Sequence, residues 1–217
     1  MPVEPLSVSI LAIMYFGDVV FAISGALTAA RHRMDLLGFV LIGTITGIGG
    51  GTTRDLLLGR TVWWTENPTE LLLCSGAALL TFFSVRRDIS QRKGMIWSDA
   101  LGLAAFSVVG CHIALQFGAA VVIAVFMGMI TATGGGIIRD VLTNTKPMIL
   151  SGQLYASVAI FGSLTYAVLL QYLGVPDVVA QWLAFTAAFA LRAATIVFDI
   201  HMGPPGEFLR VGKRDQG

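Results

Sequence analysis

The chain has 217 residues, of which 55% are hydrophobic and only 12% charged, and its mean hydropathy is +0.79. Soluble domains usually carry about 25% charged residues, so this chain has about half the charge expected of a water-exposed protein. This composition argues against a water-soluble enzyme and predicts a protein of the lipid bilayer. The formal net charge of +1 gives no indication of a nucleic-acid or acidic partner.

Seven apolar stretches approach the length of about 20 helical residues that a membrane crossing requires. The first follows Met1–Pro5, which lacks a basic segment, so we expect a retained span and not a cleaved signal peptide. Residues 100–138 contain no Asp, Glu, Lys or Arg, and Gln116–Gly118 is the natural turn that divides this stretch. The predicted spans are residues 6–30, 36–58, 70–85, 97–115, 119–142, 148–173 and 178–200.

The basic residues indicate how these spans are oriented. With the N-terminus outside, ten of the 14 Lys and Arg residues lie in cytoplasmic segments and only Arg60 lies outside, as the positive-inside rule requires. We therefore expect a multi-pass protein with a cytoplasmic tail over residues 201–217. The ten basic residues in the predicted cytoplasmic segments are Arg31, Arg33, Arg86, Arg87, Arg92, Lys93, Lys146, Arg210, Lys213 and Arg214.

An internal repeat determines the architecture. A shift of 85 residues places Gly43–Asp55 on Gly128–Asp140, and eight of these thirteen positions are identical. Each copy holds three spans, an odd number, so the second copy must enter the membrane from the opposite side. The sequence predicts an all-α integral membrane protein with seven transmembrane helices in an inverted 3+3 repeat plus a seventh helix. Within the single transmembrane domain, 1–217, the repeats cover residues 10–87 and 95–173, and the last helix covers residues 177–200.

Each repeat contains a glycine triplet, and two interpretations of the triplets compete. In the first, small residues let helices pack closely. In the second, the triplets kink or unwind the second and fifth spans, so that freed backbone carbonyls line an ion path. The inverted pairing of the triplets favours a kink that lines a path. The triplets are Gly49, Gly50 and Gly51, and Gly134, Gly135 and Gly136.

Arg54 and Asp55 follow the first triplet, and Arg139 and Asp140 follow the second. Isolated charges in a bilayer are costly and usually functional. Neighbouring helical residues point about 100° apart, so we expect the Arg of one helix to meet the Asp of the other, or each Arg to bind freed carbonyls. Two interpretations of these four charges are compatible with each other. They can form a salt-bridge network that joins the two repeats, and they can form a polar constriction in an ion path.

Two further intramembrane charges, Asp18 and Arg192, are candidate partners of this network, although Asp18 could instead lie in a wet vestibule. The remaining polar motifs are weak. His32, His112 and His201 lack metal-ligand spacing, and His112 is expected to be a hydrogen-bonded interior residue. Cys74 and Cys111 lie in apolar stretches and are expected to be small buried residues. No catalytic arrangement or phosphate-binding loop is recognisable, so we expect no enzyme activity, cofactor or bound metal.

Two copies of Gly-Gly-Gly-x-x-Arg-Asp on the second and fifth of seven spans resemble the prokaryotic trimeric intracellular cation (TRIC) channels. This family overlaps a bacterial membrane family labelled glycine-transporter-like. The resemblance covers about residues 10–200, and Ser98–Phe106 also resembles the fourth span of the family.

The resemblance implies a homotrimer in which each subunit has its own pore, permeable to potassium and other monovalent cations. It places the pore between the kinked second and fifth helices, on both triplets and their Arg-Asp pairs. Membrane lipids and the transported cations are then its partners, with no nucleic acid and no cofactor. The Lys-Glu-Val motif of animal members is absent, so a prokaryotic plasma membrane is the expected location.

A secondary transporter for a small solute such as an amino acid is the main alternative, because inverted repeats occur in transporters as well. Seven helices leave little material for a rocking domain, which favours the channel. A purely structural membrane protein would not explain the buried charged pairs.

Overall fold

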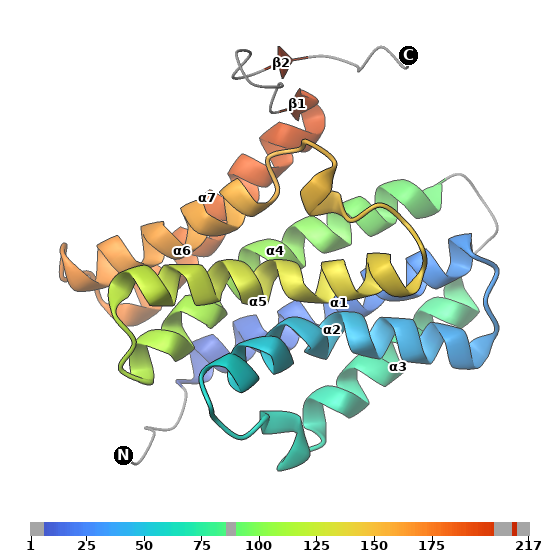
Figure 1. Cartoon of the computed structure of the whole chain (residues 1–217), viewed down its shortest axis with the longest axis horizontal. Helices are drawn as coiled ribbons and strands as arrows, with labels where there is room; N and C mark the ends of the chain where they lie inside the picture. Colours follow the sequence, from blue (N-terminus) through green and yellow to red (C-terminus); the bar gives the residue numbers. More distant parts are fainter. Residues whose placement is uncertain (1–6, 86–89, 202–209, 212–217) are drawn as a thin grey trace.

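The computed structural model describes residues 7–85, 90–201 and 210–211 and places seven α-helices within them (Figure 1). They are α1 (Val8–Arg31), α2 (Leu36–Leu57), α3 (Thr69–Ser84), α4 (Ser90–Gln116), α5 (Val121–Leu142), α6 (Ala156–Gln171) and α7 (Asp177–Val197). Two 3-10 turns, η1 (Trp63–Thr65) and η2 (Met148–Leu150), precede α3 and α6. Two short strands, β1 (Ile200–His201) and β2 (Arg210–Val211), pair antiparallel after α7.

Local sequence signals set several of these boundaries. Ser7 caps α1, and the Asp35 carboxylate accepts a 2.9 Å hydrogen bond from the backbone N–H of Gly38 at the start of α2. Between these helices, Arg33 turns the chain with a left-handed φ of 54°. A tight connection of this kind makes α1 and α2 antiparallel neighbours.

The distribution of polarity is the reverse of that in a soluble protein. Large apolar side chains point outward, among them Leu80, Phe83 and Val122, which are 70–79% exposed. Charged side chains are buried instead, and such a molecule is stable only in an apolar solvent. The buried charged residues among those described are Asp18, Arg54, Asp55, Glu70, Asp99, Arg139, Asp140 and Arg192.

Helix lengths also match a bilayer. Among the described residues, five helices, α1, α2, α4, α5 and α7, are long and apolar enough to cross it. The helices α3 and α6 have 16 residues each, about 24 Å, which is several ångströms less than a hydrocarbon core of about 30 Å. Arg86 and Arg87, expected to complete the third span, lie outside the described residues.

The helices form an inverted pair of three-helix units with α7 added. Within each unit the three helices pack on one another, and α1 of the first unit packs on α4 of the second. Residues related by the 85-residue shift lie at equivalent positions in the two units. For example, Trp63 and Met148 are related by this shift, and η1 begins at Trp63 whereas η2 begins at Met148. In Figure 1, α2 and α5 lie side by side and run in opposite directions, as an inverted repeat requires. The central helix, α4, contacts α1, α5, α6 and α7.

The glycine triplets lie where α2 and α5 cross. A Cβ atom added to Gly50 would overlap the backbone carbonyl of Thr131, and one added to Gly135 would overlap that of Thr46. These two contacts are equivalent under the 85-residue shift, so the pseudo-two-fold axis passes between them. The backbones approach more closely than any side chain would permit.

Of the two distortions predicted for the triplets, a kink or an unwound segment, the structure excludes the unwound segment. Both α2 and α5 continue as α-helix through their glycines, so no backbone carbonyl is released there. The physical reason is that two unbroken helices can already pack backbone against backbone when glycine removes every side chain from the crossing. The triplets therefore serve close packing of α2 on α5, and a kink that lines an ion path stays a prediction.

The sixth predicted span also began too early. Residues 148–155 form η2 and a turn, and α6 starts at Ala156. Pro147 precedes this segment, and Gly152 takes a left-handed φ of 78°, so an apolar sequence here is not a helix. Its apolar residues instead pack against the main core, as Met148 and Ile149 do. The last helix ends at Val197, three residues before the predicted end, and most of the expected tail lies outside the described residues.

We expect Gly50→Ala and Gly135→Ala each to lower the thermal unfolding midpoint of the purified protein strongly, because the added methyl group would separate α2 from α5. Gly76→Ala is the matched control, since nothing lies within 4 Å of its added Cβ. That control should keep or raise stability, because Ala is favoured over Gly in a helix by about 1 kcal/mol. Equal midpoints for all three variants would show that the crossing is not a close contact.

Candidate functional site

The buried charges, together with the partly exposed Arg60, form two groups, one beyond each end of the α2–α5 crossing. We call Asp18, Arg54, Asp55, Arg60 and Glu70 the first centre. Asp99, Arg139, Asp140 and Arg192 form the second centre. Arg54 and Arg139 each follow the crossing glycine of their helix by four residues, about 6 Å along the axis, and the antiparallel helices send them in opposite directions.

Arg139 anchors the second centre. Its Nε lies 2.8 Å from Asp140 Oδ1, and its Nη1 lies 2.7 Å from Asp99 Oδ1. The same Nη1 donates to Ser24 Oγ at 2.7 Å, and Nη2 contacts the Met148 sulfur at 3.5 Å. Arg139 is fully buried, and all three of its nitrogens have partners.

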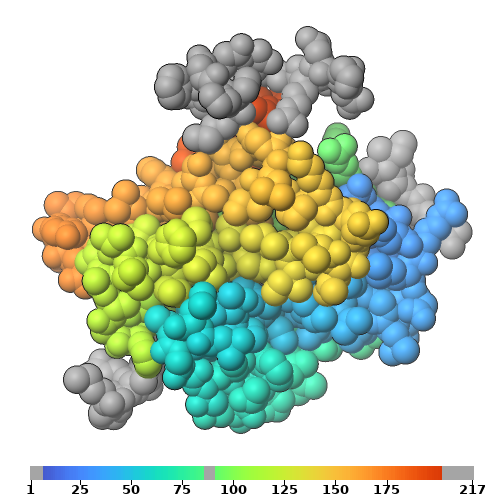
Figure 2. Space-filling model, in the orientation of Figure 1, coloured from blue at the N-terminus to red at the C-terminus, as the bar shows by residue number. Residues whose placement is uncertain are grey.

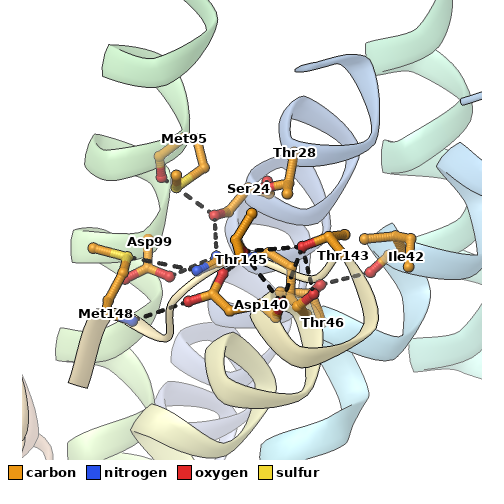
Figure 3. A network of polar contacts seen from close by, with 11 residues as sticks. Ser24, Thr28, Ile42, Thr46, Met95, Asp99, Asp140, Thr143, Thr145 and Met148 are labelled. Carbon is orange, nitrogen blue, oxygen red and sulfur yellow. Dashed lines mark hydrogen bonds and ion pairs between the residues drawn. The ribbon is translucent and has the colours of Figure 1, made fainter. Parts of the chain in front are cut away.

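Four elements supply these partners. Figure 3 shows Ser24 on α1, Asp99 on α4, Asp140 on α5 and Met148 at η2 pointing toward one another. The other oxygen of Asp140 accepts a 3.0 Å hydrogen bond from the Met148 backbone, so the carboxylate also holds η2 against α5. This centre therefore joins both three-helix units in the interior of the protein.

Arg54 anchors the first centre with fewer partners. Its Nε and Nη2 lie 2.9 Å and 2.8 Å from the same oxygen of Asp55. Its guanidinium lies 5.4 Å from the ring centre of Trp63, a cation–π distance, and Trp63 contacts Gly51. Arg60 approaches Asp55 at 3.6 Å from a partly exposed position.

The expectation that each Arg would meet the Asp of the other helix is wrong. Each binds the Asp next to it, since the antiparallel crossing carries the two pairs apart. The flexible side chain of Arg reaches back to its neighbour although the two Cβ atoms diverge.

The two other predicted charges, Asp18 and Arg192, lie near the centres but form no ion pair with them among the described residues. Asp18 is fully buried, but neither of its carboxylate oxygens has a hydrogen-bond partner among the described residues. It is therefore neither in a wet vestibule nor paired with an Arg. Arg192 donates to Gln153 Oε1 at 3.1 Å and lies over the Tyr155 ring at 5.1 Å, without an ion pair in the described part of the chain.

The sequence patterns did not identify Asp99 and Glu70 as site residues. Asp99 appeared only as part of a family-like segment, and Glu70 as a span end. A usable signal was present: the 85-residue shift equates Glu70 with Tyr155, and both side chains are buried. An added Cβ on Gly136 would lie 2.8 Å from Tyr155 Oη and 3.4 Å from Asp99 Oδ1, so both border the second triplet.

His112 is a hydrogen-bonded interior residue, as expected. Its Nδ1 lies 2.6 Å from the Tyr166 hydroxyl, which donates to Asp177 at 2.6 Å. Cys74 and Cys111 are free and buried, also as expected. Neither cysteine belongs to a metal-binding cluster in the segments that the structure describes.

The sequence and structure of the chain match one group of bacterial membrane proteins. The family model described as "Glycine transporter" matches residues 11–86 and 96–171. The inner membrane protein YadS of Escherichia coli, of the UPF0126 group, is 40% identical over 188 residues, which cover 86% of this chain and 91% of that protein.

Solved structures give the same result. The TRIC trimeric intracellular cation channel orthologue from Rhodobacter sphaeroides is 44% identical, with a TM-score of 0.86 over 89% of this chain and all of that chain. The chain belongs to the bacterial TRIC family. A second TRIC cation channel, studied for the basis of its conductance, is 34% identical with a TM-score of 0.80, over 94% of this chain and 98% of that one. These relatives of the TRIC protein are channels and membrane proteins rather than enzymes.

The two matched segments of the family model correspond to the two repeats, since each spans three helices. Figure 2 shows the face on which the surfaces of α5 and α2 adjoin, as their crossing requires. The family assignment thus applies to the part of the chain that holds both triplets and both charged centres.

We expect Arg139→Met to be strongly destabilising, because it leaves the carboxylates of Asp99 and Asp140 buried without their cation. Breaking a buried ion pair from one side costs about 3–5 kcal/mol. The double variant Arg139→Met/Asp99→Asn should recover part of this loss, and chemical unfolding of the four proteins of the cycle measures the coupling.

Arg60→Met is the control for this cycle, because its ion pair is longer and partly exposed. Such pairs contribute about 1 kcal/mol or less. If the effects of Arg139→Met and Asp99→Asn simply add within about 0.5 kcal/mol, the two side chains are not coupled and the second centre is not a unit.

Proposed function

We propose that the protein is a channel for monovalent cations, potassium included, in which each subunit of a homotrimer has its own ion path between α2 and α5. The observation that carries this proposal is the pair of buried Arg-Asp centres, one beyond each end of the α2–α5 crossing. The description of the solved relatives as trimeric cation channels supports both the activity and the assembly.

The arrangement of charge suits cations in spite of two buried arginines. A bare guanidinium would repel a cation, but Arg54 and Arg139 each lie within 3 Å of a carboxylate oxygen. The pairing cancels most of the positive potential. The backbone contact at the crossing separates the centres, so conduction requires the two helices to move apart locally or the ions to pass beside the glycines.

Arg54 is the better candidate for a gate. Arg139 has four side-chain partners, whereas Arg54 is held by one carboxylate and one aromatic ring. Displacing Arg54 therefore breaks fewer contacts. Moving one charge across the whole membrane is worth about 2.3 kcal/mol per 100 mV, so a mobile Arg54 would make opening depend on voltage.

We place the protein in a prokaryotic plasma membrane with the N-terminus outside and the C-terminus in the cytoplasm, in contact with lipids. The bias of basic residues supports the orientation, although Arg86, Arg87, Lys213 and Arg214 lie outside the described residues. The naming of its relative YadS as an inner membrane protein supports the location. The two family matches, over residues 11–86 and 96–171, support the boundaries proposed for the repeats, 10–87 and 95–173.

A secondary transporter is the less favoured alternative. The name of the matching family mentions a glycine transporter, and an inverted repeat is common to both classes. Relatives of known structure over nearly the whole chain are described as cation channels, which favours conduction.

The purified protein in a planar bilayer with a potassium gradient should give unitary currents that reverse near the potassium potential. Arg54→Gln should change the voltage dependence of opening more than Arg60→Gln, which removes a partly exposed charge nearby. A silent bilayer over a range of voltages and calcium concentrations, combined with solute uptake into vesicles, would contradict the channel and support the transporter.

Labelling of introduced cysteines in intact cells tests the orientation. Cys74 and Cys111 are buried and should react little, so they give a low background. With the N-terminus outside, Glu66→Cys should react with an impermeant maleimide and Asp35→Cys should not. The reverse pattern would show that the predicted orientation is inverted.

A further inference from the structure

The two charged centres differ in their charge balance. The second has two carboxylates, Asp99 and Asp140, and two guanidinium groups, Arg139 and Arg192. The first has three carboxylates, those of Asp18, Asp55 and Glu70, and only two guanidinium groups, those of Arg54 and Arg60. With every group ionised, the second centre is neutral and the first has one negative charge in excess.

The excess lies at Asp18 and Glu70. Asp55 is paired with Arg54 and approached by Arg60, whereas both oxygens of Asp18 and the Oε2 of Glu70 are buried without a hydrogen-bond partner among the described residues. Asp18 is 0% exposed and Glu70 is 3% exposed. An uncompensated carboxylate in such a place is strongly disfavoured unless a positive charge joins it.

Comparison of the two repeats explains why Asp18 forms no ion pair with Arg54. Under the 85-residue shift Asp99 corresponds to Met14, which precedes Asp18 by one helical turn on the same face of α1. Asp99 reaches Arg139 at 2.7 Å. Asp18 is four residues, about 6 Å, nearer the middle of its helix and makes no ion pair with Arg54.

The two carboxylates nevertheless lie at one junction, where α1, α2 and α3 meet. The Cys74 thiol of α3 donates to the backbone oxygen of Asp18 at 3.6 Å, and an added Cβ on Gly47 of α2 would lie 3.1 Å from that oxygen. Glu70 precedes Cys74 by four residues and therefore lies on the same face of α3.

We expect the Asp18 side chain to lean toward the level of Glu70. Helical side chains lean toward the N-terminus of their helix, which for α1 is the end that faces the start of α3. The charges of Glu70 and Arg54 both act on Asp18. The indole N–H of Trp63 also approaches the Glu70 carboxylate, whose Oε2 has no hydrogen-bond partner among the described residues.

We propose that Asp18 and Glu70 form a binding site for one monovalent cation per subunit, which supplies the positive charge that the first centre lacks. As a resident ion site beside the α2–α5 path, it rests on the proposed function and deepens it. The single negative charge that the first centre has in excess matches a monovalent rather than a divalent ion. A shared proton would satisfy only two of the three unpartnered oxygens, whereas a cation can bind all three.

The thermal unfolding midpoint of the full-length protein, measured as potassium replaces choline at constant ionic strength, tests this site. The wild-type midpoint should rise and saturate, and Asp18→Asn should remove the dependence by removing the excess charge. Glu66→Gln, which neutralises an exposed acid, should keep it. A wild-type midpoint that does not respond to potassium would overturn the proposal.

Equilibrium binding of rubidium to the detergent-purified wild type supplies a test that does not depend on the folding of Asp18→Asn. One ion per subunit is expected, and Glu70→Gln should weaken binding by about a hundredfold, as the loss of an adjacent opposite charge at a partly shielded site predicts. An infrared band of a protonated carboxyl group that persists in saturating potassium would show that a proton occupies the site, and would overturn the proposal.

These measurements are separable from the test of conduction. Rubidium binding together with a silent bilayer would keep the site and reject the channel. Potassium currents without rubidium binding would keep the channel and reject the site.

Discussion

The backbone contact between α2 and α5 is the constraint on which the rest of the structure depends. Gly50 lies against the carbonyl of Thr131, and Gly135 lies against that of Thr46, so the two contacts are copies of each other. This reciprocity fixes the pseudo-two-fold axis and joins the two three-helix units. It also decides where the charges go, because residues that follow each glycine by one turn emerge on opposite sides of the crossing.

The burial of eight charged side chains follows from the solvent. In a bilayer an Arg or Asp on the outer surface would face hydrocarbon, so the interior is the less costly place for it. The second centre meets this requirement within the protein, since Arg139 has partners from α1, α4, α5 and η2. The first centre meets it only in part. One turn of helix separates the position of Asp18 from the one that would match Asp99, and that offset leaves a negative charge without a partner.

In our proposal, the difference between the centres gives the two halves of the repeat different roles. A centre in which Arg139 is held by four side chains is suited to holding the units together. A centre with a loosely held Arg54 and an unbalanced carboxylate is suited to attracting a cation and to moving. Near-identical motifs, Gly-Gly-Gly-x-x-Arg-Asp in both, thus acquire distinct properties from residues outside the motif, chiefly Asp18, Glu70, Asp99 and Tyr155.

The amino-acid sequence alone was sufficient to predict seven helices, the inverted repeat and the family, because hydropathy, helix length and an 85-residue shift are one-dimensional patterns. It also identified Arg54, Asp55, Arg139 and Asp140 as buried charges. Only the tertiary structure decided that the triplets stay helical and that each Arg binds its neighbouring Asp. The start of α6 at Ala156, the partners of Arg192 and the lack of a hydrogen-bond partner for Asp18 among the described residues were decided there as well. The reason is that these outcomes depend on which backbones touch and on how far a flexible side chain reaches. Both are set by the crossing of helices that lie far apart in the sequence.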